Sequence, residues 1–550
     1  MSIVHKSKLL IIVLGFLVYF RILFNGFVWD DTTYILGNRE IQQFNLVTLV
    51  GPNMFNSSGY FRPIPAIYFS LLYHIFEESA FFYHLTQLIL HIICTLLLLK
   101  IFQKFFTPPL SLLLSLIFLV HPINVESVAY IGSTQSQIYF IFGSLAILSS
   151  DILKTNLYLF IAIFTKEVSF LYLILVYFYR WLYKLTLSLK FISITVVSLL
   201  IYFIVRFSVL GGIFQKMHLI PISEISLLHR LAHIPIVHFY YLKTFFYPKI
   251  LVIDQIWLIK DLNWSNFYLP LIIISLIYGL LIGYLIHLYK NDHKLAKPFL
   301  FFFVWYALGM GMISQIFPLD MTVADRWFYF PIVGLLGMIG IFITKIKINK
   351  MLFAVCILIL LSARTVVRTG DWKNALTLYQ HDTPLYENYD LENFLGYELA
   401  KSGLRPEALK HFIRASVLLP HDTNLFNIAS TYEELGDYSN AILYYDKTLN
   451  IRDRYLNHST IRELAFTRLT RLLVIYHNPR DVLPYLQLAT SEFPQNGTFW
   501  SFLAITEYKL KNRDVALDAA TKAKTLLPNP TTAKLYNLIL NNKEINIKFD

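Results

Sequence analysis

Two adjacent carboxylates, Asp30 and Asp31, stand directly after the first apolar segment of the chain, between Trp29 and Tyr34. Charged groups at the edge of a membrane are costly, so their presence there points to a function. A carboxylate in this position can remove the proton from a hydroxyl group beside a lipid-borne substrate. The alternative is a helix N-cap or a solvated turn, where Asp is common. The position of the pair favours the chemical interpretation.

His121 and Glu126 form a second polar group, in the segment His121-Pro-Ile-Asn-Val-Glu126 after the third apolar run. We expect both side chains to face the outer surface together, either as an interfacial cap or as part of a binding site. Two such residues without a third ligand give little support to a metal site. The sequence therefore indicates no metal centre, although it does not exclude a divalent ion.

Three cationic residues stand where apolar segments begin or end: Arg62, Lys166 and Arg326. The planar guanidinium of Arg326 suits phosphate, and an unneutralised Lys166 can meet a lipid phosphate. The alternatives are a salt bridge between Lys166 and Glu167, and an interface anchor in which Asp325 and Arg326 pair beside an aromatic run.

The elements that must position these residues are membrane-spanning helices. The chain has 550 residues, 56% of them hydrophobic, and apolar runs that suit a bilayer recur through its first two thirds. The predicted spans, about eleven, are 8–24, 81–104, 109–121, 136–151, 156–166, 168–184, 189–209, 268–289, 298–316, 328–344 and 351–364. Lys166 and Glu167 favour two short spans over one long span across 156–184, because an ion pair at mid-bilayer is costly.

Charge is divided unevenly along the chain. The segment after residue 380 holds 19 Lys and Arg against 20 Asp and Glu, which leaves 28 basic and 15 acidic residues before it. The formal net charge of +12 thus belongs to the membrane half, where basic residues gather in every second loop. This pattern indicates membrane topology rather than nucleic-acid binding, and it predicts a cytoplasmic N-terminus. The long outer loops and the C-terminal region then lie across the membrane.

The C-terminal third carries an internal repeat whose second copy follows 33 residues after the first, close to the 34-residue period of the tetratricopeptide repeat. Small residues at fixed positions let the two helices of each hairpin cross closely, and stacked hairpins bury a shared face. The matching positions are Gly396, Gly403, Ala408, Phe412, Ala415 and Pro420, then Ala429, Tyr432, Gly436, Ala441 and Tyr445, then Trp500, Ala504, Ala516, Ala523 and Pro528. The stretch 457–494 is predicted to be a helical but degenerate unit. Such an array either binds a protein or packs on its own membrane domain.

The fold class is therefore all-α: a polytopic membrane domain over 1–370, followed by an extracytoplasmic tetratricopeptide-repeat α-solenoid over 371–550. A Walker motif is absent from the sequence, so ATP is not the obvious energy source. GxSxG, HExxH and CxxC motifs are absent as well. Cys94 and Cys356 both lie in apolar spans, and no disulfide framework is implied.

An ordered set of short motifs resembles the membrane and tetratricopeptide-repeat glycosyltransferases of the GT-C superfamily, over essentially the whole chain. The eukaryotic members are protein O-mannosyltransferases of the endoplasmic reticulum. The motifs are Phe27-Val-Trp-Asp-Asp31, Tyr60-Phe-Arg-Pro63, His121-Pro-Ile-Asn-Val-Glu-Ser-Val-Ala129, Thr165-Lys-Glu167, Asp325-Arg-Trp-Phe-Tyr-Phe-Pro331 and Arg368-Thr-Gly-Asp-Trp372. Relatives commonly show a Gly-Arg-acidic turn after the His-Pro motif, whereas this chain has Gly132-Ser-Thr-Gln-Ser-Gln137.

The resemblance implies a GT-C fold and transfer of a sugar, a mannose-like hexose, from a polyprenyl phosphate to an acceptor hydroxyl on a protein. The transfer is a single inverting displacement at the outer or lumenal face, with Asp30 or Asp31 as the base. The implied donor-phosphate residues are Arg62, Lys166 and Arg326, of which Arg326 is preferred, and the implied substrate-pocket residues are Trp29, His121, Glu126 and Asp325. No covalently bound cofactor is implied.

The implied location is a bacterial inner membrane with periplasmic repeats, or the endoplasmic reticulum with lumenal repeats. The implied partners are a membrane lipid, the polyprenyl phosphate, and an acceptor protein or peptide recruited by the repeats. A different class of function is a non-catalytic membrane scaffold whose repeats dock protein partners. A transporter or flippase is a third hypothesis, but it requires charges in mid-span, and those found lie near span ends.

Overall fold

The computed structural model describes residues 3–51, 60–211, 221–345, 351–451 and 459–545. Within these ranges the ordered elements are helices, with one isolated β-bridge between Gln255 and Val323. The chain divides into two compact units, Met1–Tyr386 and Glu387–Asp550. The predicted fold class is confirmed: the protein is an all-α membrane protein with a tetratricopeptide-repeat solenoid.

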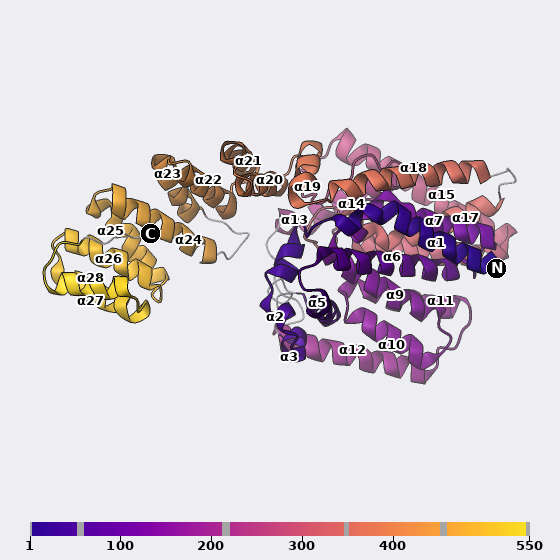
Figure 1. Cartoon of the computed structure of the whole chain (residues 1–550). Coiled ribbons are helices and arrows are strands. Elements are labelled where there is room, and N and C mark those ends of the chain that lie inside the picture. The colour runs from indigo at the N-terminus through magenta and orange to yellow at the C-terminus, as the bar shows by residue number, and fades with distance from the viewer. Residues whose placement is uncertain (1–2, 52–59, 212–220, 346–350, 452–458, 546–550) are drawn as a thin grey trace. The chain divides into compact units, whose positions relative to one another are not determined.

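Each predicted span corresponds to a helix of the first unit (Figure 1). These helices are α1 (Ile3–Tyr19), α6 (Ala80–Phe102), α7 (Pro108–Val120), α9 (Thr134–Leu148), α10 (Ile152–Ile163), α11 (Phe170–Leu182), α12 (Leu189–Leu210), α15 (Leu269–Asn291), α16 (His293–Met312), α17 (Pro331–Lys345) and α18 (Met351–Asp371). Shorter or peripheral helices lie between them: α2 (Arg39–Gln43), α3 (Leu46–Val50), α5 (Pro63–Phe76), α8 (Val125–Ala129), α13 (Pro221–Glu224), α14 (Leu227–Phe246) and α19 (Ala375–Asp382). The stretch 156–184 forms two helices, α10 and α11, as the Lys166-Glu167 pair predicts.

Six helices of the described chain are long and apolar enough to cross a membrane, and a seventh crossing results if the bent pair α7–α8 is one span. Helices α5, α10 and α17 are apolar but shorter. The predicted number of about eleven spans stays a prediction, since length and composition alone do not count the crossings.

Several of these helices expose apolar side chains on one side. In α12, α15 and α18, Leu200, Leu280 and Leu360 are more than half exposed. Exposed apolar side chains along a helix call for an apolar partner, and for helices of this length that partner is the hydrocarbon of a bilayer. Helices α12, α15 and α18 therefore present lipid-facing surfaces.

Two contacts join helix ends that the predicted topology places on the same side of the membrane. Lys345, at the end of α17, pairs with Asp292, between α15 and α16, with Nζ and Oδ2 2.5 Å apart. In the last turns of α18 the Thr365 hydroxyl donates to the carbonyl of Val120, the last residue of α7, over 2.7 Å. The first contact joins two predicted inner loops, and the second joins two predicted outer ends. The grouping matches the predicted alternation, while the side that faces the cytoplasm stays a prediction.

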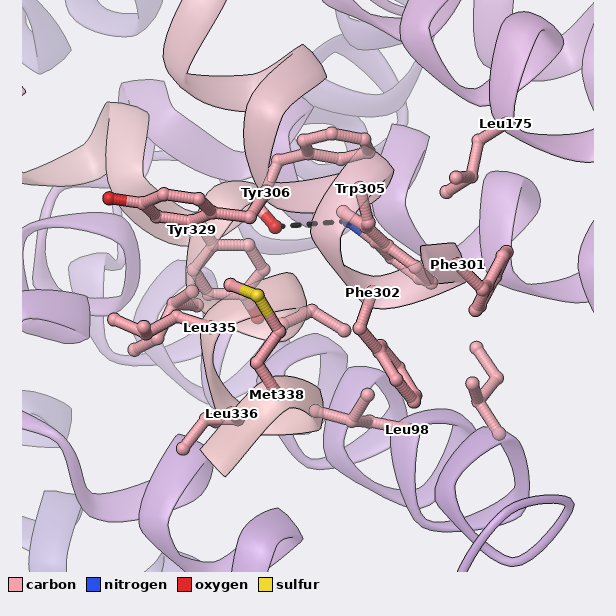
Figure 2. Packing of buried hydrophobic residues seen from close by; sticks show 14 of the residues in the cluster. Leu98, Leu175, Phe301, Phe302, Trp305, Tyr306, Tyr329, Leu335, Leu336 and Met338 are labelled. Carbon is pink, nitrogen blue, oxygen red and sulfur yellow. Dashed lines mark hydrogen bonds between the residues drawn. The ribbon is translucent and has the colours of Figure 1, made fainter. Parts of the chain in front are cut away.

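Helices α16 and α17 pack closely at the centre of the first unit. A Cβ at Gly334 of α17 would lie 2.4 Å from the backbone nitrogen of Tyr306, so a residue without a side chain lets the two backbones approach. Figure 2 shows Phe302 and Trp305 of α16 in this buried layer, with the Trp305 indole N–H donating to the carbonyl of Phe330 over 3.1 Å. This layer fixes the start of α17 and the segment before it.

The first unit extends to Tyr386, beyond the boundary at 370 that the sequence predicts. Arg368 of α18 binds both carboxylate oxygens of Asp382 in α19, at 2.6 and 2.9 Å. Asp382 also accepts a hydrogen bond from the backbone of Ile253, at 3.0 Å. These bonds tie α19 to the membrane unit.

The second unit consists of helical hairpins that follow one another along the chain (Figure 1). They are α20 (Tyr389–Lys401), α21 (Arg405–Leu418), α22 (Asp422–Glu434), α23 (Tyr438–Asn450), α24 (Ser459–Tyr476), α25 (Pro479–Glu492), α26 (Gly497–Lys509), α27 (Arg513–Leu526) and α28 (Pro530–Leu540). Gly403 and Gly436 turn the first two hairpins with φ of +83° and +81°, a conformation that favours glycine. A Cβ at Gly396 would lie 2.7 Å from the ring of Phe412. The left-handed turns and the close contact between helices explain why glycine stands at these positions of the repeat.

Candidate functional site

The predicted site residues lie where long helices give way to short ones. Four short helices carry them or lie beside them: η2 (Thr32–Leu36), η4 (Ile131–Ser133), η5 (Glu167–Ser169) and η7 (Asp325–Tyr329). Backbone groups at helix ends lack partners within the helix. Here they are used to hold carboxylates from other segments.

Asp31 is buried and fixes the loop after the first helix. One oxygen accepts the backbone N–H of Gly132 over 2.7 Å, and the other accepts that of Val28 over 3.2 Å. Burial raises the pKa of Asp31 to about 8, against the lowering effect of these N–H groups. Both oxygens are thus committed to the backbone, which makes Asp31 a structural anchor between residues 28 and 132.

Asp30 is only half-buried and has a different environment. Its carboxylate accepts a hydrogen bond from the hydroxyl of Tyr130 over 3.1 Å. Burial raises the pKa of Asp30, while the Tyr130 hydroxyl and the charge of Arg326 lower it. The preceding residue, Trp29, has a φ of +54°, which is uncommon for a bulky residue, and its ring lies 5.1 Å from that of Tyr130. Asp30 is therefore the more accessible carboxylate of the pair.

Arg326 forms a buried ion pair with Glu126. The backbone N–H of Arg326 donates to the same carboxylate over 3.0 Å, so η7 and α8 are joined by both side chain and main chain. The guanidinium also lies 3.7 Å from Asp320 and 5.2 Å from the centre of the Trp29 ring. Arg326 thus faces the loop that carries Trp29 and Asp30, and Glu126 already neutralises much of its charge.

Arg62 is engaged in a similar way. Its guanidinium binds Glu167 through Nε at 2.9 Å and Nη2 at 2.8 Å, and it donates to the Gln135 side chain over 3.0 Å. Glu167 also lies 3.4 Å from Arg206 of α12. Gln135 belongs to the uncharged segment 132–137, so an amide stands beside Arg62.

Lys166 is the cation with the fewest partners. Its ammonium donates to the hydroxyl of Ser136 over 3.2 Å, and within the described ranges it has no ion pair, since Glu167 binds Arg62 and Arg206 instead. Burial and the charges of Arg62 and Arg326 lower the pKa of Lys166 to about 7. The alternative of a Lys166–Glu167 salt bridge is wrong.

His121 and Glu126 do not face the outer surface together; both are buried. The His121 ring accepts the N–H of Ile123 at 3.2 Å, and its other nitrogen contacts the carbonyl of Phe245 at 2.9 Å. The cap interpretation holds for His121, because both ring nitrogens are used by the backbone. Glu126 turns inward to Arg326.

Asp325 is buried beside its neighbour Arg326 but points to another element. Its carboxylate accepts the Tyr240 hydroxyl of α14 over 2.7 Å, and Tyr240 in turn accepts from the Gln255 side chain, also over 2.7 Å. Burial and the charge of Glu126 raise the pKa of Asp325 to about 8. These contacts make Asp325 an anchor for η7.

Several residues of the cluster were missed by sequence reasoning. Tyr130 directly follows the His-Pro motif and carries the hydrogen bond to Asp30. Asp320 lies six residues before Arg326 and approaches its guanidinium. Burial raises the pKa of Tyr34, and so does the charge of Asp30, while Arg62 opposes the rise. Of these residues, only Tyr130 could have been found from the sequence, because it directly follows the His-Pro motif.

Other features of the described chain lie away from this cluster. A hollow of about 570 Å³ runs along the lipid-facing side of α15, between Leu271 and Leu280, and one of about 310 Å³ lies beside Trp500 in the repeat unit. Neither contains a predicted site residue. The described residues contain no group of three or more His, Cys, Asp or Glu suited to a metal ion.

Comparisons with known proteins agree with the layout. The tetratricopeptide-repeat family matches residues 425–458. The chain is 24% identical over 480 residues to the human (Homo sapiens) "Protein O-mannosyl-transferase TMTC3", covering 76% of this chain and 52% of that protein. It is 23% identical over 457 residues to the Caenorhabditis elegans "Protein O-mannosyl-transferase F38B6.6", covering 76% of this chain and 63% of that protein.

A solved structure, "MamA 41-end from Desulfovibrio magneticus RS-1", matches 28% of this chain and 95% of that chain at 18% identity and a TM-score of 0.24, too low to support a fold assignment. The chain spans between half and two thirds of the length of the two curated relatives. The alignments to those relatives cover about three quarters of this chain, more than the repeats alone. The chain is thus a relative of the TMTC-like, tetratricopeptide-repeat proteins named as protein O-mannosyl-transferases.

Proposed function

We propose that this protein is a membrane glycosyltransferase that moves a mannose-like hexose from a polyprenyl phosphate to a hydroxyl group of a protein. The names of its relatives support the protein O-mannosyl-transfer activity. The observation that carries the proposal is a half-buried carboxylate, Asp30, on which the charge of Arg326 acts, while Arg326 and Arg62 act together on Lys166. All four residues lie between the long apolar helices. An acid beside cations is what transfer from a phosphate requires.

In the proposed reaction the acceptor hydroxyl oxygen attacks the anomeric carbon of the sugar. Its proton passes to Asp30, and the bond between the anomeric carbon and the phosphate oxygen breaks. The polyprenyl phosphate leaves with the bonding electrons, and the configuration inverts. Cations near the leaving oxygen stabilise the charge that develops there.

The geometry favours Asp30 over Asp31 as the base. Asp31 is buried with both oxygens held by backbone N–H groups, whereas Asp30 keeps one hydrogen bond, to Tyr130, and is partly exposed. A general base must be within hydrogen-bond reach of the proton that it takes, and only Asp30 offers an accessible oxygen.

Lys166 replaces Arg326 as the preferred phosphate ligand. Arg326 is neutralised by Glu126, and Arg62 by Glu167, while Lys166 is bound only to a serine hydroxyl within the described chain. A phosphate that approaches Arg326 or Arg62 must compete with a carboxylate, and one that approaches Lys166 does not.

The acceptor is a protein or peptide in this proposal, and the repeats recruit it. Stacked helical hairpins offer an extended surface for such a partner. The proposed location is a cellular membrane, with the site and the repeats on the extracytoplasmic side, in the bacterial periplasm or the lumen of the endoplasmic reticulum.

A transfer assay on Asp30→Asn and Asp31→Asn tests this function, with polyprenyl-phosphate mannose as donor and a Ser/Thr peptide as acceptor. We expect Asp30→Asn to lose activity by about 10² to 10⁴-fold while its melting temperature stays near that of the parent. Asp31→Asn is expected to lower the stability by about 1–3 kcal/mol, because one backbone N–H loses its acceptor. An Asp30→Asn variant as active as the parent contradicts the assignment, and a parent without transferase activity favours the scaffold function.

A further inference from the structure

The end of α18 and the residues directly after it hold the start of the loop 25–31, which contains Asp30, through backbone carbonyl groups. The N–H of Gly26 donates to the carbonyl of Lys373 over 2.9 Å. The side-chain amide of Asn25 donates to the carbonyl of Thr369 over 3.1 Å. Residues 25 and 26 lead directly to Asp30. The end of α18 therefore fixes the base of the loop that carries the proposed catalytic carboxylate.

Trp372 links the end of α18 to the Asp30 carboxylate through Tyr130. Its side chain is fully buried, and its ring stacks on that of Tyr130 with centroids 6.3 Å apart and planes at 27°. The hydroxyl of Tyr130 makes the hydrogen bond to Asp30. Within the described ranges the Trp372 indole N–H has no hydrogen-bond partner. Trp372 thus acts through its ring face and not through its polar atom.

Trp372 is itself held firmly. The guanidinium of Arg368 lies 5.8 Å from the centre of its ring. Arg368 is buried and bound by Asp382 at 2.6 and 2.9 Å, with Asp371 at 3.4 Å. A rigid neighbour of this kind restricts the tilt of the Tyr130 ring, and the tilt sets where the phenol hydroxyl lies.

We propose that Trp372 is a positioning residue for the proton transfer at Asp30, acting through Tyr130. This inference rests on the proposed function. A base must be held close to the productive geometry, and a misplacement of about 1 Å can cost up to about 10²-fold in rate. The ring of Trp372 sets the direction of the Tyr130 hydroxyl, and that hydroxyl sets the orientation and proton affinity of the Asp30 carboxylate.

The test compares the pH profiles of Trp372→Met, Trp372→Phe and Tyr130→Phe in the full-length protein, with polyprenyl-phosphate mannose and a Ser/Thr peptide. In Trp372→Met we expect kcat to fall about tenfold, with the donor KM little changed. Because the Tyr130 hydroxyl favours the ionised carboxylate, its loss or displacement moves the acidic limb of the profile to higher pH. Tyr130→Phe should move this limb in the same direction. Trp372→Phe keeps a stacking ring, so its acidic limb and its kcat should lie close to those of the parent.

Trp305→Phe is the matched control, since Trp305 is another fully buried tryptophan, in the α16–α17 layer of Figure 2. It should lower the melting temperature and leave the acidic limb in place. A Trp372→Met profile that coincides with the parent profile overturns the inference, and Trp372→Leu serves in its place if the Met variant does not fold. If Asp30→Asn is inactive while both Trp372 variants keep the parent profile, only this inference fails. A parent without transferase activity overturns both.

Discussion

At the scale of single residues, the two aspartates differ because their surroundings differ. Asp31 accepts two backbone N–H groups and is buried, while Asp30 meets one phenol hydroxyl and is partly exposed. Environments that push the pKa values of two neighbouring carboxyl groups apart can give the two groups separate tasks. A loop anchor and an accessible base follow from one Asp-Asp pair.

Lys166 carries a prediction about pH. Burial and neighbouring cations lower its pKa to about 7, and only the protonated ammonium attracts a phosphate. The donor KM of the parent should therefore rise as the pH increases through about 7. Lys166→Arg, which stays charged, should keep a flat donor KM from pH 6 to 9, and Lys166→Met should show a high KM throughout. Steady-state kinetics across this range measure the effect, and a flat profile in the parent would show that Lys166 does not bind the donor.

The sequence revealed the charged residues of the site but not their pairing. Asp30, Arg62, Lys166 and Arg326 were recognised because charges at apolar boundaries are conspicuous. The bond between Arg326 and Glu126 joins residues 200 positions apart, and no local pattern predicts such a contact. The membrane-edge rule also placed His121 at the surface, whereas the fold buries its ring as a backbone cap.

At the scale of elements, glycines decide how closely α16 and α17 cross. A Cβ at Gly334 meets the Tyr306 backbone, which cannot move aside as a side chain can. We expect Gly334→Ala to destabilise the protein by about 1–3 kcal/mol through overpacking, measured as a lower melting temperature in detergent. Gly279→Ala on α15 is the control, because nothing lies within 4 Å of its Cβ, and it should keep or raise the melting temperature. Equal melting temperatures for the two variants would contradict close packing at Gly334.

The helices themselves were predictable, since an apolar run in a bilayer satisfies its backbone groups by forming a helix. The break at Lys166-Glu167 was predictable for a different reason, because charged side chains at mid-bilayer are costly. The short helices η4 and η7 escaped prediction because their few residues carry no periodic pattern. The place of α19 in the first unit was hidden for another reason: it depends on the buried contact between Arg368 and Asp382, two residues of different helices that no local pattern pairs.

At the scale of the whole molecule, the predicted alternation of inner and outer loops states which positions share a side of the membrane. Glu78 and Lys401 belong to predicted outer regions, Lys184 belongs to a predicted inner loop, and all three are exposed. We replace each with cysteine in turn and treat intact cells or sealed microsomes with a membrane-impermeant maleimide. In cells with the protein at the surface, Glu78→Cys and Lys401→Cys should be labelled at once and Lys184→Cys only after permeabilisation; in sealed microsomes the order reverses.

The parent protein controls for Cys94, which is buried, and Cys356, which is exposed on α18. Labelling of Lys184→Cys and Glu78→Cys from the same side would refute the alternation of the loops. If Lys401→Cys instead shares the side of Lys184→Cys, the repeats lie on the cytoplasmic side, away from the proposed site, and cannot present an acceptor to Asp30.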